Sequence, residues 1–186
     1  MIRTLCAGLL TLSMLLGAEA RAEEAPTVPA VWKQHELTLG YQGLTTDYSC
    51  RGLADKMESL LVYFGAREEG LKVSAYGCVG GPYQPSPAIN LKLRFETLVP
   101  APSNSTGVVE ARWAERQLFA DKKIQQNTPQ RIRRGDCEVV QKFTAKVLPS
   151  FTHETVHDLT TCIPHQLSGS LPNLLEKVLV PVDVEA

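Results

Sequence analysis

The sequence has no hydrophobic run long enough to span a membrane. Its longest apolar segment, Leu5 to Leu16, has 12 residues, whereas a membrane-spanning helix needs about 20. Arg3 precedes this segment and small alanines at positions 18, 20 and 22 follow it, a pattern typical of a cleaved secretory leader. We therefore predict a signal peptide over 1–22, cleaved after Ala22, and a periplasmic or extracellular protein with no membrane span.

The chain also lacks an excess of charge of either sign. Its formal net charge is −1, and removal of the leader leaves 164 residues with 17 basic and 19 acidic side chains. A nucleic-acid-binding chain usually carries a clear basic excess, so we expect no nucleic-acid partner. Because 164 residues is a common size for one domain, we predict a single exported domain over 23–186.

Sequence signatures of common catalytic chemistry are missing. The chain has no C-x-x-C pair, which argues against a thioredoxin-type redox site. It has no glycine-rich phosphate loop, and no serine has a histidine and an acid at a spacing that implies a catalytic triad. We therefore predict no catalytic residues and no cofactor, and favour a non-catalytic binding or interaction module of unknown ligand.

Cysteine is scarce, and its placement is informative. Of five cysteines, Cys6 lies in the predicted leader. The other four would remain in the exported protein: Cys50, Cys78, Cys137 and Cys162. An even number of cysteines in an exported chain favours disulfides over free thiols or a structural metal. We therefore predict two disulfides.

Element lengths select one of the three ways to pair these cysteines. Cys50 begins a predicted helix over 50–64, which rises about 22 Å. The predicted strand over 71–78 spans about 26 Å, so its end returns to the start of that helix. The same comparison applies to the helix over 137–148 and the strand that ends at residue 162. We predict the disulfides Cys50–Cys78 and Cys137–Cys162.

Residue periodicity predicts an α+β protein. Apolar residues alternate with polar ones in four segments that we predict as strands: 31–41, 71–78, 89–96 and 109–113. A fifth predicted strand, 152–162, has few apolar residues but is rich in Thr and Val. Apolar residues at helical spacing follow two predicted N-caps, Ser49 and Asp136. We predict a two-layer sandwich of a mainly antiparallel sheet and two packed helices, ordered β-α-β-β-β-α-β, with a ferredoxin-like arrangement as the first guess. The segment 171–184 fits either a helix or an edge strand.

Two finer expectations concern the middle of the chain. The loop over 100–107 separates the strands over 89–96 and 109–113, so we predict that these strands pair as a hairpin. Trp113 shares the apolar register of its strand with Val109 and Ala111. We therefore expect the Trp113 side chain in the core.

One segment matches a catalytic motif, which supplies the alternative function. His153, Glu154 and His157 form H-E-x-x-H, in which two histidines one helical turn apart bind zinc and the glutamate acts as a general base. The motif requires a helix, whereas the β-branched residues around it favour a strand. In a regular strand the two histidines would share one face about 13 Å apart, too far to hold one ion. A zinc-dependent hydrolase, with His165 or Glu176 as a third ligand, is thus the alternative.

A basic segment offers a second binding hypothesis. Arg131, Arg133 and Arg134 follow Lys122 and Lys123 in a polar stretch between two predicted elements. Such a segment could hold an anionic partner, although solvent-exposed charges without a ligand are a common alternative. We therefore consider either a protein or an anionic ligand as the partner.

Overall fold

The computed structural model describes residues 26–119 and 132–182. The predicted leader over 1–22 lies outside this range. The described chain has eight strands: β1 (Val28–Gln42), β2 (Tyr48–Ser49), β3 (Lys72–Tyr76), β4 (Pro85–Ser86), β5 (Ala88–Pro100), β6 (Val109–Phe119), β7 (His153–Asp158) and β8 (Asn173–Pro181). Its helices are α1 (Cys50–Tyr63) and α2 (Cys137–Lys146), with single 3-10 turns η1 (Arg134–Asp136) and η2 (Leu148–Ser150). Among the helices of these two ranges, none has the length and apolar content that a bilayer span requires.

Six strands form one antiparallel sheet in the order β3-β5-β1-β6-β8-β7. This sheet and the two helices confirm the α+β class and the order β-α-β-β-β-α-β, to which β8 adds a final strand. The segment that fitted either helix or edge strand is β8, and it lies inside the sheet between β6 and β7. Its residues alternate between half-buried and buried as far as Val178, and Val178, Leu179 and Val180 are all buried.

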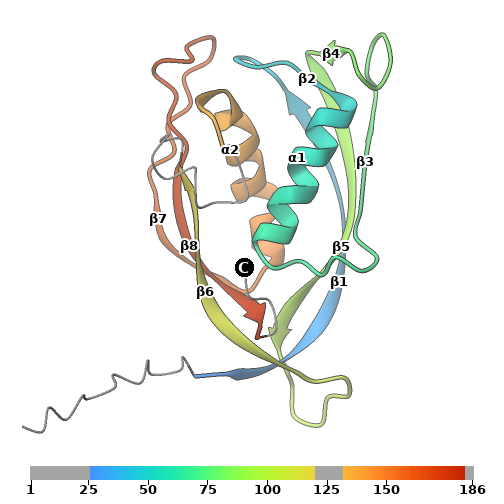
Figure 1. The fold of residues 1–186 in the computed structure, drawn as a ribbon, viewed down its shortest axis with the longest axis vertical. Helices are drawn as coiled ribbons and strands as arrows, with labels where there is room; N and C mark the ends of the chain where they lie inside the picture. The colour runs from blue at the N-terminus through green and yellow to red at the C-terminus, as the bar shows by residue number, and fades with distance from the viewer. Residues whose placement is uncertain (1–25, 120–131, 183–186) are drawn as a thin grey trace, which may run out of the picture.

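Strand pairing divides the sheet into two ribbons, which we call ribbon A (β3-β5-β1) and ribbon B (β6-β8-β7). β1 pairs with β5 from Ala30 to Gln42, but pairs with β6 only over Val28–Ala30. The ribbons therefore join at one end, and Figure 1 shows them separating from there, with α1 and α2 between them.

The predicted hairpin between the strands over 89–96 and 109–113 is wrong. β5 and β6 follow one another along the chain, but β1 lies between them in the sheet. β1 pairs with the whole of β5 along one edge, and β3 pairs with Asn90–Arg94 along the other. Ribbon A keeps the crossover expected for a ferredoxin-like arrangement, because α1 connects β1 and β3, which run parallel on either side of β5.

The main hydrophobic core lies between the helices and the two ribbons. α1 begins at Ser49, whose hydroxyl accepts a hydrogen bond from the backbone N–H of Gly52 at 3.0 Å, as predicted for an N-cap. The α1 segment buries one apolar face: Leu53, Met57, Leu60, Leu61 and Phe64. A second, small core forms where the ribbons join, with one residue from each of four strands: Ala30, Leu98, Ala111 and Leu179.

Candidate functional site

Both predicted disulfides are present. Cys50–Cys78 has a Cα–Cα distance of 6.0 Å and Cys137–Cys162 one of 5.6 Å, and each joins the first residue of a helix to the loop after the following strand. Figure 1 places both helix starts at the same end of the molecule, opposite the end where the ribbons join. The disulfides therefore fix two loops at that end. They also indicate an oxidising, exported environment.

The H-E-x-x-H motif lies on a strand, as its β-branched neighbours predict. His153 and His157 are both in β7, but the expectation that they share one face is wrong. A bulge between Thr155 and His157 shifts the register, so His153 lies opposite Val178 and His157 opposite Leu175. Because these partners point to opposite faces of β8, the two imidazoles do as well. This geometry does not provide the paired ligands that the zinc-hydrolase alternative requires.

The two histidines instead bond to separate residues of β8. The Nδ1 atom of His153 lies 3.1 Å from the Oε2 atom of Glu176, and Nε2 of His157 lies 3.1 Å from Oδ1 of Asn173. Glu176 is fully buried, and its second oxygen, Oε1, has no hydrogen-bond partner. Within 26–119 and 132–182, no group of three or more His, Cys, Asp or Glu side chains is arranged to hold a metal ion.

The basic segment is described only in part. Arg131 and both lysines lie outside the described residues. The guanidinium of Arg134 donates to the carbonyl of Ser168 at 2.6 Å, and the backbone N–H of Arg133 donates to Asp136 at 2.7 Å. Arg134 thus connects the start of α2 to the loop that contains Cys162. Anion binding by this segment stays a prediction.

A buried carboxylate on α2 fixes the loop over 43–47. One oxygen of Glu138 accepts hydrogen bonds from the backbone N–H groups of Leu44 and Thr45, at 3.1 and 3.2 Å. Its other oxygen accepts from the Thr45 hydroxyl at 3.0 Å. The side chain of Glu138 is buried, so these bonds compensate for the loss of its hydration. These bonds therefore hold the loop in one defined conformation.

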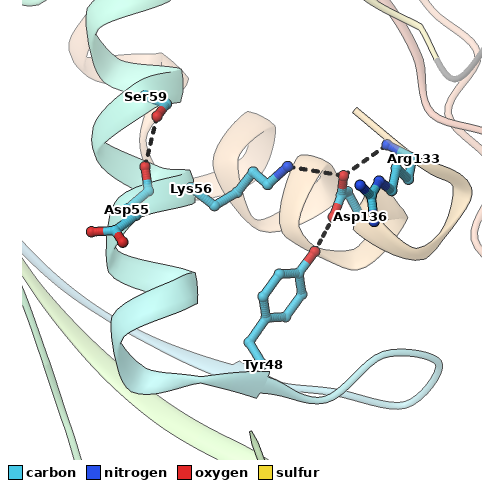
Figure 2. Close-up of polar contacts among 6 residues, drawn as sticks. All are labelled: Tyr48, Asp55, Lys56, Ser59, Arg133 and Asp136. Atoms are coloured by element: carbon cyan, nitrogen blue, oxygen red, sulfur yellow. Dashed lines mark hydrogen bonds and ion pairs between the residues drawn. The ribbon is translucent and has the colours of Figure 1, made fainter. Parts of the chain in front are cut away.

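A second buried carboxylate joins three elements at the same end. Figure 2 shows Lys56 of α1, Tyr48 of β2 and the backbone of Arg133 converging on Asp136. The ammonium of Lys56 is 3.2 Å from Oδ2 of Asp136, and the Tyr48 hydroxyl donates to Oδ1. Asp136 precedes α2, as predicted for an N-cap, but its carboxylate makes no hydrogen bond to that helix. It binds to the neighbouring elements instead.

Burial and these carboxylates also perturb two tyrosines. Burial raises the pKa of Tyr48 far above its ordinary value of 10.0, and the nearby charge of Asp136 adds to the effect. Burial likewise raises the pKa of Tyr41, with Glu138 as the next cause. In the folded protein both phenols therefore keep their protons above pH 10, where an unperturbed tyrosine loses its own. In that form they donate hydrogen bonds and fit a structural role.

Three loops lie at this end of the molecule, and we call them together the three-loop surface: 43–47, 77–84 and 159–170. The Thr45 hydroxyl donates to the carbonyl of Ile163 at 3.4 Å, which links the first and third loops. The backbone N–H of Arg51 donates to the carbonyl of Pro82 at 2.9 Å. β2 and β4 pair beside this contact, so the second loop is held against the first.

The three-loop surface carries exposed apolar side chains on every loop. Their exposed fractions are 39% for Leu44, 75% for Val79, 77% for Tyr83, 64% for Leu159 and 53% for Leu167. Single exposed apolar residues are ordinary, but a group of them on connected loops is a feature of interaction surfaces. This surface is the candidate functional site.

No protein-family model, no curated protein and no solved structure matches this chain significantly.

Sequence reasoning found the disulfides of this site but not the surface itself. The strand predicted over 152–162 ends at Asp158 in the structure, so the start of the third loop was missed. Contacts such as Thr45 with Glu138 join residues 93 positions apart in the chain. Exposed Leu and Val residues have no sequence signature that separates them from core residues. The one available sequence signal for the polar contacts beneath this surface was the pair of acidic residues at the start of α2, Asp136 and Glu138.

Proposed function

We propose that residues 23–186 form an exported, non-catalytic interaction module that binds a protein partner through the three-loop surface. The observation that carries the proposal is the exposure of apolar side chains on three loops whose backbones are fixed by disulfides and buried carboxylates. Binding through such loops loses little conformational entropy, because they are ordered before the partner arrives. The leader pattern and the two disulfides support export to the periplasm or the cell exterior.

A protein is favoured over an anionic ligand as the partner. Tyr83 and the aliphatic residues around it are types that form the buried centre of protein interfaces. Arg134, in contrast, is already bonded to Ser168. We therefore expect charge to contribute less than apolar area to the free energy of binding at this surface.

A site-specific photo-crosslinking experiment identifies the partner. A photoreactive residue at position 83 should crosslink one protein in the envelope and secreted fractions of the source cells. The same residue at position 108, an exposed valine in the loop at the opposite end of the molecule, should not crosslink it. Equal capture at both positions would contradict the proposal.

Titration of the purified partner then tests the surface itself. Tyr83→Ala should weaken binding about tenfold or more, as expected for a central interface aromatic. Val79→Ser should weaken it less, and the matched control Val108→Ser should leave it within about twofold. The proposal fails if Tyr83→Ala and Val79→Ser bind like the unaltered protein, or if Val108→Ser weakens binding as much as they do.

A further inference from the structure

A pocket of about 250 Å³ lies beside the C-terminal end of α1, away from the three-loop surface. It is bordered by β1, by the turn after α1, by β6 and by the end of β8. Its lining residues are Trp32, Val62, Gly65, Ala66, Arg67, Glu68, Glu69, Arg116, Val180 and Pro181. Apolar side chains form its walls and charged ones its rim.

The turn after α1 packs closely against β8 at Gly65, beside the pocket. Gly65 has a φ of +95°, and a Cβ atom there would lie 2.7 Å from Cγ1 of Val180. Only glycine therefore allows the turn to lie directly against β8. The contact brings Val62 and Ala66 into line with Val180, which gives the pocket its apolar walls.

Arg67 is part of the wall rather than a free cation. Its guanidinium lies over the ring of Trp32, with 5.7 Å between the guanidinium carbon and the ring centroid. It also pairs with Glu69 at 2.6 Å and with Glu96 at 3.3 Å. These two carboxylates satisfy its charge, so it holds Trp32 in place.

Arg116 has a different environment. Its Nε atom donates to the carbonyl of Tyr63 at 2.6 Å, and its guanidinium lies 5.3 Å from the centroid of the Tyr63 ring. Nη1 donates to the carbonyl of Glu115 at 3.3 Å. No carboxylate of the described residues pairs with it, although it is half-buried. Burial lowers its pKa, and the charge of Arg112 adds to this, as expected for a cation without a counter-ion.

Arg112 supplies a second observation of the same kind. It lies four residues before Arg116 on the same face of β6 and directly opposite Val180 of the pocket wall. Its Nε atom is buried and has no hydrogen-bond partner. Neither arginine forms an ion pair with a described carboxylate, although Arg116 lies directly opposite the buried Glu176 in the pairing of β6 with β8.

We propose that this pocket binds a small monocarboxylate with a short apolar body. The carboxylate accepts hydrogen bonds from the guanidinium of Arg116, and the apolar body lies against Trp32, Val62 and Val180. The pocket is slightly smaller than typical drug-sized sites, which limits the ligand to a short chain or a single ring. Glu68 on the rim is an exposed carboxylate that forms no ion pair with a described residue, and it repels a dianion more strongly than a monoanion, so a monocarboxylate is favoured over phosphate.

Hexanoate is a suitable probe, because it combines one carboxylate with a short apolar chain. Titration followed by amide and indole NMR signals should give saturable shifts at Gly65, Ala66 and Trp32. Acetate lacks the apolar body and hexanol lacks the carboxylate, so each should bind at least about tenfold more weakly. Inorganic phosphate should also bind more weakly than hexanoate.

Variants identify the residues responsible. Arg116→Gln should weaken hexanoate binding about tenfold or more, because it removes a charged hydrogen-bond donor. The matched control is Arg51→Gln at the opposite end of α1, where the arginine is exposed and paired with Asp55, and it should leave binding unchanged. Val62→Phe should fill the pocket and abolish the shifts even if Arg116→Gln disturbs the contact with Tyr63.

Three results would overturn the proposal. The first is the absence of a saturable shift at the pocket residues when hexanoate is added to the folded protein. The second is an affinity for hexanol or phosphate equal to that for hexanoate, because it would remove the need for a monocarboxylate. The third is a loss of binding in Arg51→Gln as large as that in Arg116→Gln. None of these results bears on the three-loop surface, which is tested with a different ligand and different variants.

Discussion

Two histidines of one sequence motif have different environments in the folded protein. His153 is the hydrogen-bond partner of a fully buried carboxylate, Glu176, whereas His157 bonds to the neutral side chain of Asn173. Loss of the partner of a buried charge is much more costly than loss of a neutral hydrogen bond. The two residues should therefore contribute unequally to stability.

We predict that His153→Ala lowers the free energy of unfolding by about 2–3 kcal/mol, because Glu176 is left without a donor. The matched change His157→Ala should cost less than about 1 kcal/mol. Urea unfolding monitored by circular dichroism measures both. Adding Glu176→Gln to His153→Ala should recover part of the loss, since a neutral amide is easier to bury than a carboxylate. Equal losses for the two single variants would contradict this account.

The buried face of β6 was predicted incorrectly from the sequence. Val109, Ala111 and Trp113 predicted the buried face of their strand, but Trp113 is 36% exposed. The face of β6 that meets the helices carries Ala114 and Leu118, together with Arg112 and Arg116. Because charged residues usually lie on the solvent-exposed face of a strand, the two arginines led to the wrong assignment of the buried face. Arg116 also lines the proposed ligand pocket, and Arg112 lies beside it on the same strand face.

At the scale of elements, local spacing predicted more than long-range pairing did. The helices, their starts and both disulfides followed from periodicity and from element lengths. The partner of β6 did not, because β1 and β6 are separated by nearly 80 positions where they meet, at Ala30 and Val109. No local pattern in either strand specifies that contact. The bulge in β7 was also not predictable from the sequence, because it depends on the register in which β7 pairs with β8.

Each disulfide should stabilise its own loop more than the other loop. Cys50→Ser with Cys78→Ser releases the loop over 77–84, and Cys137→Ser with Cys162→Ser releases the loop over 159–170. Either double variant should lose about 3.5 kcal/mol of unfolding free energy by the chain-entropy model. Hydrogen exchange should show loss of protection mainly in the released loop. Equal loss in both loops from one double variant would show that the disulfides do not act locally.

At the scale of the whole molecule, buried polar contacts connect elements that the sheet does not join directly. Asp136 brings together β2, α1 and the start of α2, while Glu138 connects α2 with the loop after β1. The Tyr48 hydroxyl donates to Asp136. The Tyr41 hydroxyl donates to the carbonyl of Thr46 at 2.7 Å and lies 3.5 Å from an oxygen of Glu138. The protonation of two phenols is thereby linked to global unfolding.

This linkage has a defined sign. The pKa values of Tyr41 and Tyr48 are raised in the folded protein and return to about 10 on unfolding. Above that pH the unfolded chain loses protons that the folded chain retains, so stability is complete below about pH 10 and falls as the pH rises further. Urea midpoints measured between about pH 8 and 11 should decline accordingly. Tyrosinate absorbance should show two of the five tyrosines ionising only together with unfolding.

A pair of tyrosine variants provides the control. Tyr48→Phe should lower stability at neutral pH, because Asp136 loses a donor, and should reduce the decline at alkaline pH. Tyr76→Phe removes a phenol that is 51% exposed and should leave the decline as it is. If both variants show the same alkaline decline as the unaltered protein, Tyr48 does not contribute to it.

The order of the disulfides along the chain has a consequence for biosynthesis. Cys50 pairs with Cys78 and Cys137 with Cys162, so every cysteine after the predicted leader bonds to its nearest neighbour in sequence. A chain that enters an oxidising compartment from its N-terminus presents these thiols in that same order. An oxidase that joins each thiol to the next one to emerge therefore makes the native bonds directly, and maturation requires no disulfide isomerase.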